Sequence, residues 1–472
     1  MTGYNGSYKI SRIHRIACTL FLFAAILTAF SIGAAADEVP VDRETIDLNI
    51  KAAYNDENIH FLFEFDSAQM QYPGIYHDYY RFEDGEWVRD GYNEDRMTML
   101  LGGHQVNYFD TLGCFVTCHD DVRFMPDSPS AEEVGAHEYL GGVLGVSDVR
   151  KYIPETRGDP LSWDNIVSQE ELDQLREDGV FLDLIHWRAH RSNPVGYSDS
   201  QHILEFRHSD TGQSPYYTNW DDDNDRPAYM FDPEVTGFVA LDWEDVRDRN
   251  LGMDDYYYLA EEFAVPFDSE YEWQEGDTIP RRIITAPTES RGQITADGTW
   301  SEGTWTVELV RKLDTGYQLE DLALSEGEVY YISPAVHIGD TSGRDHYVTW
   351  GHSLGIGTEA DVEAVRFTGQ SPEWNEVPGT TISLFYPSVF SYASLFDGEL
   401  HGTGIVCTEA GAPVPHGAER MGEFGFELER SLAEPVDPEP EPEPEPEPVP
   451  GFGVLLAISG TLAAVYLMAK IK

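Results

Sequence analysis

The stretch NIKAAYNDENIHFLFEFDS, residues 49–67, decides the fold class. After the turn-rich residues 55–58, apolar side chains alternate with other residues from Ile59 to Phe65, which predicts a strand that follows a hairpin loop. Similar alternation recurs in TWTVELVR (304–311), EVYYIS (328–333), HYVTW (346–350) and TISLFY (381–386). The sequence therefore predicts a mainly β protein.

The predicted strands are joined by long connections rich in Pro and Gly, and helical patterns are short, as in residues 168–178. We expect one globular region over residues 37–432, folded as an immunoglobulin-like β-sandwich. It should carry a large insertion of loops and short helices at about residues 108–232. A β-barrel is the second choice.

A short cysteine motif, GCFVTCHDD (113–121), lies inside that expected insertion. A c-type haem is bound by two cysteine sulfurs, and the histidine after the second cysteine ligates the iron. Here Cys114 and Cys118 enclose three residues instead of the usual two, and His119 follows. The alternatives are a disulfide, which export would permit and which would not require His119, or a metal site, which lacks a second close cysteine pair.

Several further segments accompany this motif in a familiar order: 49–67, NEDRMTMLLGG (93–103), DTLGCFVTCHDDVRFM (110–125), LDLIHWRAHRSNPVGYSDSQH (182–202), 276–316 and GEVYYISPAVHIGD (327–340). Over about residues 45–360 the chain resembles the haem-binding subunit family of ethylbenzene dehydrogenase. That family is also described as the cytochrome c-552/DMSO reductase-like haem-binding domain. The resemblance implies a DOMON-like β-sandwich that holds a haem between loops and passes electrons.

The resemblance also implies two kinds of haem. The ethylbenzene enzyme binds a b-type haem through Met and Lys, whereas other members carry a Cys-x-x-x-Cys-His attachment. Because this chain has the attachment motif, we expect covalent c-type haem, with b-type haem as the alternative.

The second iron ligand has several candidates. Met125 lies six residues past His119 in a loop, and its thioether would raise the reduction potential. Met99, with Met97, is closest to the methionine ligand of the family but also fits a core position. His186 and His190 are one turn apart if their segment is helical. Arg188 and Arg191 suit haem propionates, although salt bridges to carboxylates explain them equally.

Both ends of the chain indicate export. Residues 1–36 read as a signal peptide, with basic residues, an apolar run and Ala34-Ala35-Ala36; an uncleaved anchor is the alternative. Residues 433–450 form a Pro/Glu stalk. Residues 451–472 hold an apolar run of nearly membrane-spanning length and a basic end. This tail resembles the archaeal sorting signal that begins Pro-Gly-Phe, which implies processing by an archaeosortase.

The chain is strongly acidic, with 85 Asp+Glu against 30 Lys+Arg, a formal charge of −55 and a pI near 4.3. Self-repulsion of this size is tolerable where salt screens it, so we interpret the charge as adaptation to high salt. Nucleic acid is excluded as a partner by the same charge.

Two classes of function remain. The first is an electron-transfer cytochrome at the outer face of the cytoplasmic membrane, more an electron carrier than a catalyst, since the cofactor carries the chemistry. Its partner would be a molybdenum oxidoreductase or a quinone-linked cytochrome. The second is a haem-free adhesion or carbohydrate-binding sandwich with a disulfide between Cys114 and Cys118.

Overall fold

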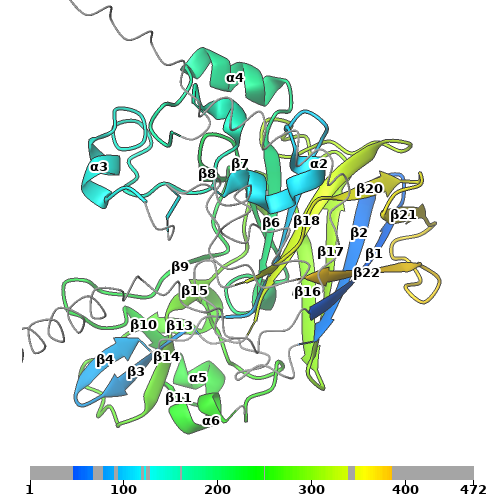
Figure 1. Ribbon diagram of the computed structural model, residues 1–472. Helices are drawn as coiled ribbons and strands as arrows, with labels where there is room; N and C mark the ends of the chain where they lie inside the picture. Colours follow the sequence, from blue (N-terminus) through cyan, green and yellow to red (C-terminus); the bar gives the residue numbers. More distant parts are fainter. Residues whose placement is uncertain are drawn as a thin grey trace, which may run out of the picture. The chain divides into compact units, whose positions relative to one another are not determined.

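The computed structural model describes residues 46–66, 78–89, 94–118, 122–123, 128–159, 162–248, 250–338 and 346–384 (Figure 1). The expected signal peptide, stalk and C-terminal segment lie outside these residues, as do His119 and Met125.

Among the described residues, thirteen strands form one large sheet. Its strands lie in the order β16 (Thr295–Ser301), β17 (Thr304–Lys312), β2 (Asn58–Asp66), β1 (Ile46–Tyr54), β21 (Val362–Arg366), β20 (His352–Ile356), β18 (Val329–His337), β5 (Arg96–Gly102), β6 (Leu182–Arg188), β7 (Asp199–Ile203) and β8 (Arg207–Ser209). Off this path, β19 (Tyr347–Val348) pairs with β18, and β22 (Gly379–Leu384) pairs with β1. The pairing is antiparallel except that β21 runs parallel to β1 and to β20.

The strands of three smaller sheets lie between strands of the large sheet in the chain. They are β11 (Leu241–Asp242), β14 (Asp277–Pro280), β3 (Tyr79–Glu83) and β4 (Glu86–Arg89); β12 (Leu259–Ala260), β15 (Arg282–Ile284) and β9 (Tyr216–Thr218); and β10 (Tyr229–Phe231) with β13 (Ala264–Pro266). Their apolar residues, among them Tyr79, Phe231 and Ile279, form a second core.

The helices of the described residues are short, and none is long and apolar enough to cross a membrane. The α-helices are α2 (Phe109–Leu112), α3 (Ala131–Ala136), α4 (Gln169–Glu177), α5 (Pro233–Thr236) and α6 (Trp243–Arg247). The 3-10 helices are η1 (Gly113–Thr117), η2 (Pro154–Thr156), η3 (Asn193–Val195), η4 (Glu261–Phe263) and η5 (Glu289–Gly292). Helix α4 begins as its sequence predicts, because Ser168 and Glu171 form a capping box.

The main core lies between two parts of the large sheet. One part contributes alternate residues of β2 and β17, such as Phe61 and Trp305, and the other contributes Met99, Ile185 and Trp187 from β5 and β6. The rings of Trp187 and Trp305 meet edge to face, with centroids 5.0 Å apart. Burial of a side chain the size of Phe61 contributes about 1.5–3 kcal/mol, so this contact between the two parts stabilises the sandwich.

The edge strand β16 is covered by the segment that leads into β7. Ala296 N donates to Gly196 O at 2.9 Å, and Ser198 N donates to Ile294 O at 3.0 Å. The approach requires glycine at 298, because a Cβ there would lie 2.3 Å from the Trp187 ring. The sheet therefore curls toward closure, which protects an edge that would otherwise expose unpaired backbone groups.

The structure confirms the mainly β fold class and the strands predicted at 59–65, 304–311 and 328–333, and it describes residues 381–384 of the strand predicted at 381–386 as part of β22. Within the insertion expected at about 108–232, β6, β7 and β8 are part of the large sheet. The segment that contains His186 is the strand β6, which corrects the helical hypothesis. Every residue of β6 is buried, and apolar and polar residues alternate in one phase only over residues 185–188, since Asp183 and Leu184 reverse the pattern.

Candidate functional site

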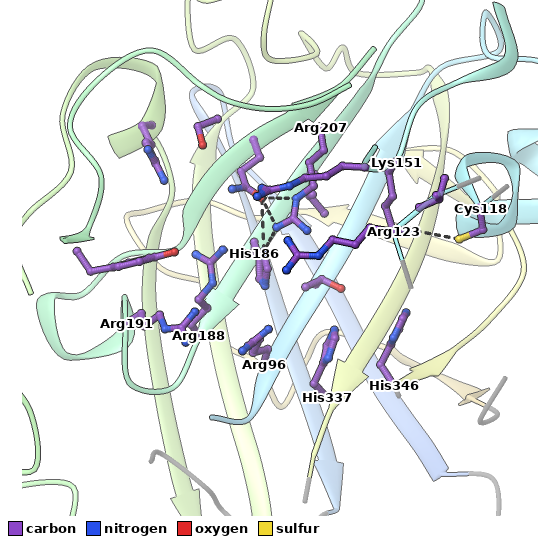
Figure 2. A pocket seen from close by; sticks show the side chains of 18 residues that line it. Arg96, Cys118, Arg123, Lys151, His186, Arg188, Arg191, Arg207, His337 and His346 are labelled. Carbon is purple, nitrogen blue, oxygen red and sulfur yellow. Dashed lines mark hydrogen bonds between the residues drawn. The ribbon is translucent and has the colours of Figure 1, made fainter. Parts of the chain in front are cut away.

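A cavity of about 470 Å³ lies on the face of the large sheet opposite the main core (Figure 2). Its position follows from the two-residue period of the strands. In β5, Met97 and Met99 point into the core, whereas Arg96 and Thr98 line the cavity. The volume lies within the range of about 300–1,000 Å³ that is typical of small-molecule sites.

Cross-strand pairing brings the residues of the cavity floor together. His337 of β18 pairs with Arg96 of β5, which pairs in turn with Arg188 of β6. Thr98 and His186 form the adjacent pair. Paired side chains on one face lie about 4.5–5.5 Å apart at Cβ, and Figure 2 shows Arg96, His186 and His337 directed into the same space.

The cysteine segment forms part of the wall. Its 3-10 helix η1 lies against β18, and a Cβ on Gly113 would lie 2.6 Å from Ser333 Oγ. That hydroxyl accepts a hydrogen bond from Cys114 N at 2.9 Å. Both cysteines are buried, with exposed fractions of 6% for Cys114 and 8% for Cys118. Cys118 lines the cavity, and Cys114 lies at the contact with β18.

Lys151 joins the cysteine segment to the cavity. Its Nζ lies 3.1 Å from Cys118 Sγ and 3.1 Å from Thr117 Oγ1. An ammonium group at this distance stabilises negative charge on sulfur. Lysine is scarce in this chain, so its presence beside the motif is a specific feature of the wall.

The lining is strongly cationic. It contains no Asp or Glu among the described residues, and eight of its side chains carry positive charge: Arg96, Arg123, Arg150, Lys151, Arg188, Arg191, Arg207 and Arg291. The whole chain holds only 30 Lys+Arg against 85 Asp+Glu. A cavity with this composition is suited to a ligand that carries negative charge.

Carboxylates behind the wall neutralise part of this charge, each shared between cations. The distances that follow join a guanidinium nitrogen to a carboxylate oxygen. Asp199 pairs with Arg188 (2.6 Å) and Arg291 (2.5 Å). Glu94 pairs with Arg191 (3.1 Å) and Arg96 (3.6 Å), and Asp148 pairs with Arg123 (2.7 Å) and Arg150 (3.4 Å). Asp78 is a further partner of Arg191 at 2.7 Å. Burial alone would raise the pKa of Asp199, but Arg188 and Arg291 outweigh it and lower that pKa.

Two imidazoles of the cavity, those of His186 and His337, are held in their neutral form. Burial, followed by the charges of Arg188 and Arg207, lowers the pKa of His186 well below its ordinary value. Burial also lowers the pKa of His337 well below that value, with His346 and Arg96 as further causes. The rings of His337 and His346 stack with centroids 4.5 Å apart and an angle of 13°.

Residues 28–349 match the ethylbenzene dehydrogenase family, which is more than half of the chain. The chain belongs to this family. The matched range contains every residue that lines the cavity. It also accounts for the fold, since the family has a DOMON-like β structure.

Two further comparisons concern shorter segments. Cytochrome c-552 of Stutzerimonas stutzeri is 30% identical over 125 residues, which is 26% of this chain and 38% of that protein. Residues 449–471 match the PGF-CTERM motif. This member of the ethylbenzene dehydrogenase family is therefore an exported cell-surface protein anchored at its C-terminus.

The structure brings some of the residues predicted from the sequence together and separates others. Cys118 and His186 line the cavity. Met99 is fully buried in the main core, which agrees with core packing as its role. His190 lies beyond β6, and its ring packs against Tyr79 with centroids 5.4 Å apart. Its pKa is lowered, chiefly by burial.

In this member of the ethylbenzene dehydrogenase family, sequence reasoning missed most of the wall, including Arg96, Lys151, Arg207 and His337. A signal existed for Arg96, because in RMTML it alternates with the methionines and so points away from them. A signal also existed for Lys151, which is one of few lysines. The other two depend on strand pairing.

Proposed function

We propose that this protein binds a haem in the cationic cavity beside Cys118 and transfers electrons at the outer face of the cytoplasmic membrane. The observation that carries the proposal is the composition of the cavity wall, which combines a cysteine sulfur, neutral imidazoles and eight cations and includes no carboxylate among the residues that the structure describes. Membership of the ethylbenzene dehydrogenase family and the partial similarity to a cytochrome c-552 support it.

The residues present fit a haem. When bound, a haem supplies an iron that takes up and releases single electrons. Its propionates need cationic partners, for which a guanidinium fork is well shaped. Arg123 and Arg150 line the cavity, and both are partly exposed. Arg188 and Arg191 are held by buried carboxylates instead, as the salt-bridge interpretation predicts.

The chain offers nitrogen ligands from two of its segments. We assign the first iron ligand to His119, because it directly follows Cys118 in the motif. The second would come from the cavity lining, where the imidazole of His337 is neutral and stacks on the ring of His346. Neutral imidazole is the form that binds a metal. Met125 is the alternative second ligand.

The attachment is proposed to be covalent, through Cys118 and Cys114. Cys118 lies at the cavity, and its sulfur is next to Lys151. Cys114 lies at the other end of the η1 turn, where Thr117 Oγ1 donates to Cys114 O at 2.8 Å. A b-type haem held without thioether bonds is the competing form.

The C-terminal anchor keeps the site close to the membrane. Electrons would then pass between the haem and a membrane-associated partner, either a molybdenum oxidoreductase or a quinone-linked cytochrome. The protein side of this exchange consists of binding, orientation and tuning of the haem. No acid–base residue of the cavity is required to act on a substrate.

The test is covalent haem content. The full chain is produced in a host with c-type cytochrome maturation, and its pyridine haemochrome spectrum is recorded after denaturation. We expect haem to stay with the wild-type chain and to be lost from Cys118→Ser. It should also stay with the control Cys407→Ser, which removes a cysteine outside the motif. Haem that is bound but extractable from the wild type would indicate the b-type form. A colourless wild-type protein would reject the proposal in favour of a haem-free surface module.

A further inference from the structure

We propose that the same cavity contains a separate binding site for a small inorganic oxyanion, formed by His186, Arg188 and Arg207. The inference rests on the proposed function in one respect, because it assumes that the haem propionates neutralise other cations of the wall. The three side chains come from β6 and β8, and Figure 2 shows them gathered above the strands.

The first step concerns the proton of His186. Its Nδ1 lies 3.0 Å from Nη2 of Arg188 and 3.0 Å from Nη2 of Arg207. A guanidinium group has donors and no acceptor, so Nδ1 must accept. The neutral ring then carries its proton on Nε2. Gln201 Oε1, 3.5 Å from the same Nδ1, does not change this assignment, because Arg207 donates to that oxygen at 2.7 Å.

The second step concerns what Nε2 can bind. Its N–H has no hydrogen-bond partner among the described residues, although His186 is buried and lines the cavity. A protonated Nε2 has no lone pair for iron, so His186 is a hydrogen-bond donor and not an axial ligand. Arg188 Nε is a second buried donor without a partner in the described residues. Buried donors of this kind require an acceptor, and an oxyanion provides several.

The third step is the charge of the wall. Six of the eight cations form ion pairs with four carboxylates among the described residues: Asp78, Glu94, Asp148 and Asp199. Asp78 is also shared with Arg281 and Arg282. Among the described residues, the cations of the lining therefore outnumber these carboxylate partners by two to one. The propionate pair of a haem would neutralise part of that excess and leave the rest for a further anion.

Three groups from different strands respond to this excess. Burial, followed by the charge of Arg188, lowers the pKa of Arg207 to about 9. Burial, outweighing the attraction of Glu94, lowers the pKa of Arg96 to about 10. Arg188 and Arg191 lower the pKa of Tyr216, because they favour its charged form. Burial is the first cause of the lowered pKa of both arginines, and a bound anion would favour their charged forms.

The geometry also limits the kind of anion. The donors without a partner in the described residues are His186 Nε2 and Arg188 Nε, while the guanidinium groups of Arg188 and Arg207 hold the other ring nitrogen as an acceptor. This arrangement suits a compact anion with several equivalent oxygens. Sulfate is a convenient probe because it has no acid–base or redox chemistry under ordinary conditions.

The test is calorimetric titration of the full chain with sulfate, in haem-loaded and haem-free form, at constant ionic strength kept with chloride. We expect the haem-loaded protein to bind one sulfate saturably. Arg207→Gln should weaken binding about tenfold or more, since hydrogen bonds to charged groups are strong. The matched control is Arg366→Gln, because Arg366 is an exposed arginine that pairs with Glu326 at 2.8 Å.

His186 gives an independent check if Arg207→Gln does not fold. His186→Gln retains a side-chain N–H and should keep most of the affinity, whereas His186→Leu should lose it. Sulfate that binds only the haem-free protein would show that propionates occupy this site, which overturns the inference and leaves the haem proposal intact. Failure to take up haem rejects the proposed function alone, and sulfate binding by the haem-free chain would then support the oxyanion site. Absence of sulfate binding in both the haem-loaded and the haem-free form also overturns the inference of an oxyanion site.

Discussion

Replacing Asp199 with Asn removes the carboxylate that holds two arginines at the back of the cavity. Asp199 is fully buried on β7. One oxygen lies 2.6 Å from Arg188 Nη1, and the other lies 2.5 Å from Arg291 Nε. Asn keeps the shape of the side chain and loses its charge, so two largely buried guanidinium groups lose their counter-ion.

The expected magnitude follows from this burial. Removing one partner of a buried ion pair costs about 3–5 kcal/mol, because the other charge stays buried without compensation. We expect Asp199→Asn to lower the free energy of unfolding by about this amount near neutral pH. The pKa of Asp199 is lowered in the folded protein. Its contribution is therefore present above the ordinary value of 3.8 and is lost as the pH falls through the lowered folded value.

The assay is urea unfolding at fixed salt, since urea leaves the ionic strength unchanged. Asp148→Asn is the control, because Asp148 pairs with Arg123 and Arg150 where both arginines are 44–49% exposed. Exposed pairs contribute about 0.2–1 kcal/mol. An Asp199→Asn protein within about 1 kcal/mol of wild type would refute the reasoning. The same variant should bind sulfate more tightly, since it increases the positive charge of the cavity.

Two further predictions concern backbone conformation and titration. Gly113→Ala should lower the free energy of unfolding by about 1–3 kcal/mol, because φ is +56° and the new Cβ would lie 2.6 Å from Ser333 Oγ. The control is Gly85→Ala, whose new Cβ meets no atom within 4 Å. In thermal melts the control should show only the cost of its φ of +86°. Burial raises the pKa of Asp210 from 3.8 to about 8. The folded protein then keeps a proton that the unfolded chain releases, so the free energy of unfolding should decline as the pH rises across this interval. Asp210→Asn should reduce that decline, measured by urea unfolding at the two ends of the interval; an unchanged slope would contradict it.

The fold was largely predictable where one face of a strand meets the core and the other meets a polar environment. The alternation in β17 is of this kind. It was not predictable for β6, which is buried on both faces. The spacing of His186 in β6 and His190 beyond it then resembled a helical turn. Period-based reasoning fails at such a strand because Asp183 and Leu184 reverse the alternation of residues 185–188.

The site was predictable only in part. The cysteine motif indicated a segment of the cavity wall, since Cys118 lines the cavity. The shared face of Met97 and Met99 was also correct, but the sequence does not state which face of β5 meets the core. That depends on pairing with β6 and β18, which are far away in the chain. The cationic wall has the same origin, since its residues are spread from Arg96 to His346.

The distribution of charge links the cavity to the rest of the chain. A protein with a formal charge of −55 repels anions over long distances, whereas the cavity attracts them at contact. Salt weakens the first effect far more than the second, because the Debye length falls to about 3 Å at 1 M and buried pairs are screened much less. The cavity therefore receives an anionic ligand most readily in concentrated salt, the condition in which the acidic surface itself is tolerated. Under that condition the arginines of the cavity attract an anionic ligand, whereas a neutral wall would not offset the repulsion between the acidic chain and that ligand.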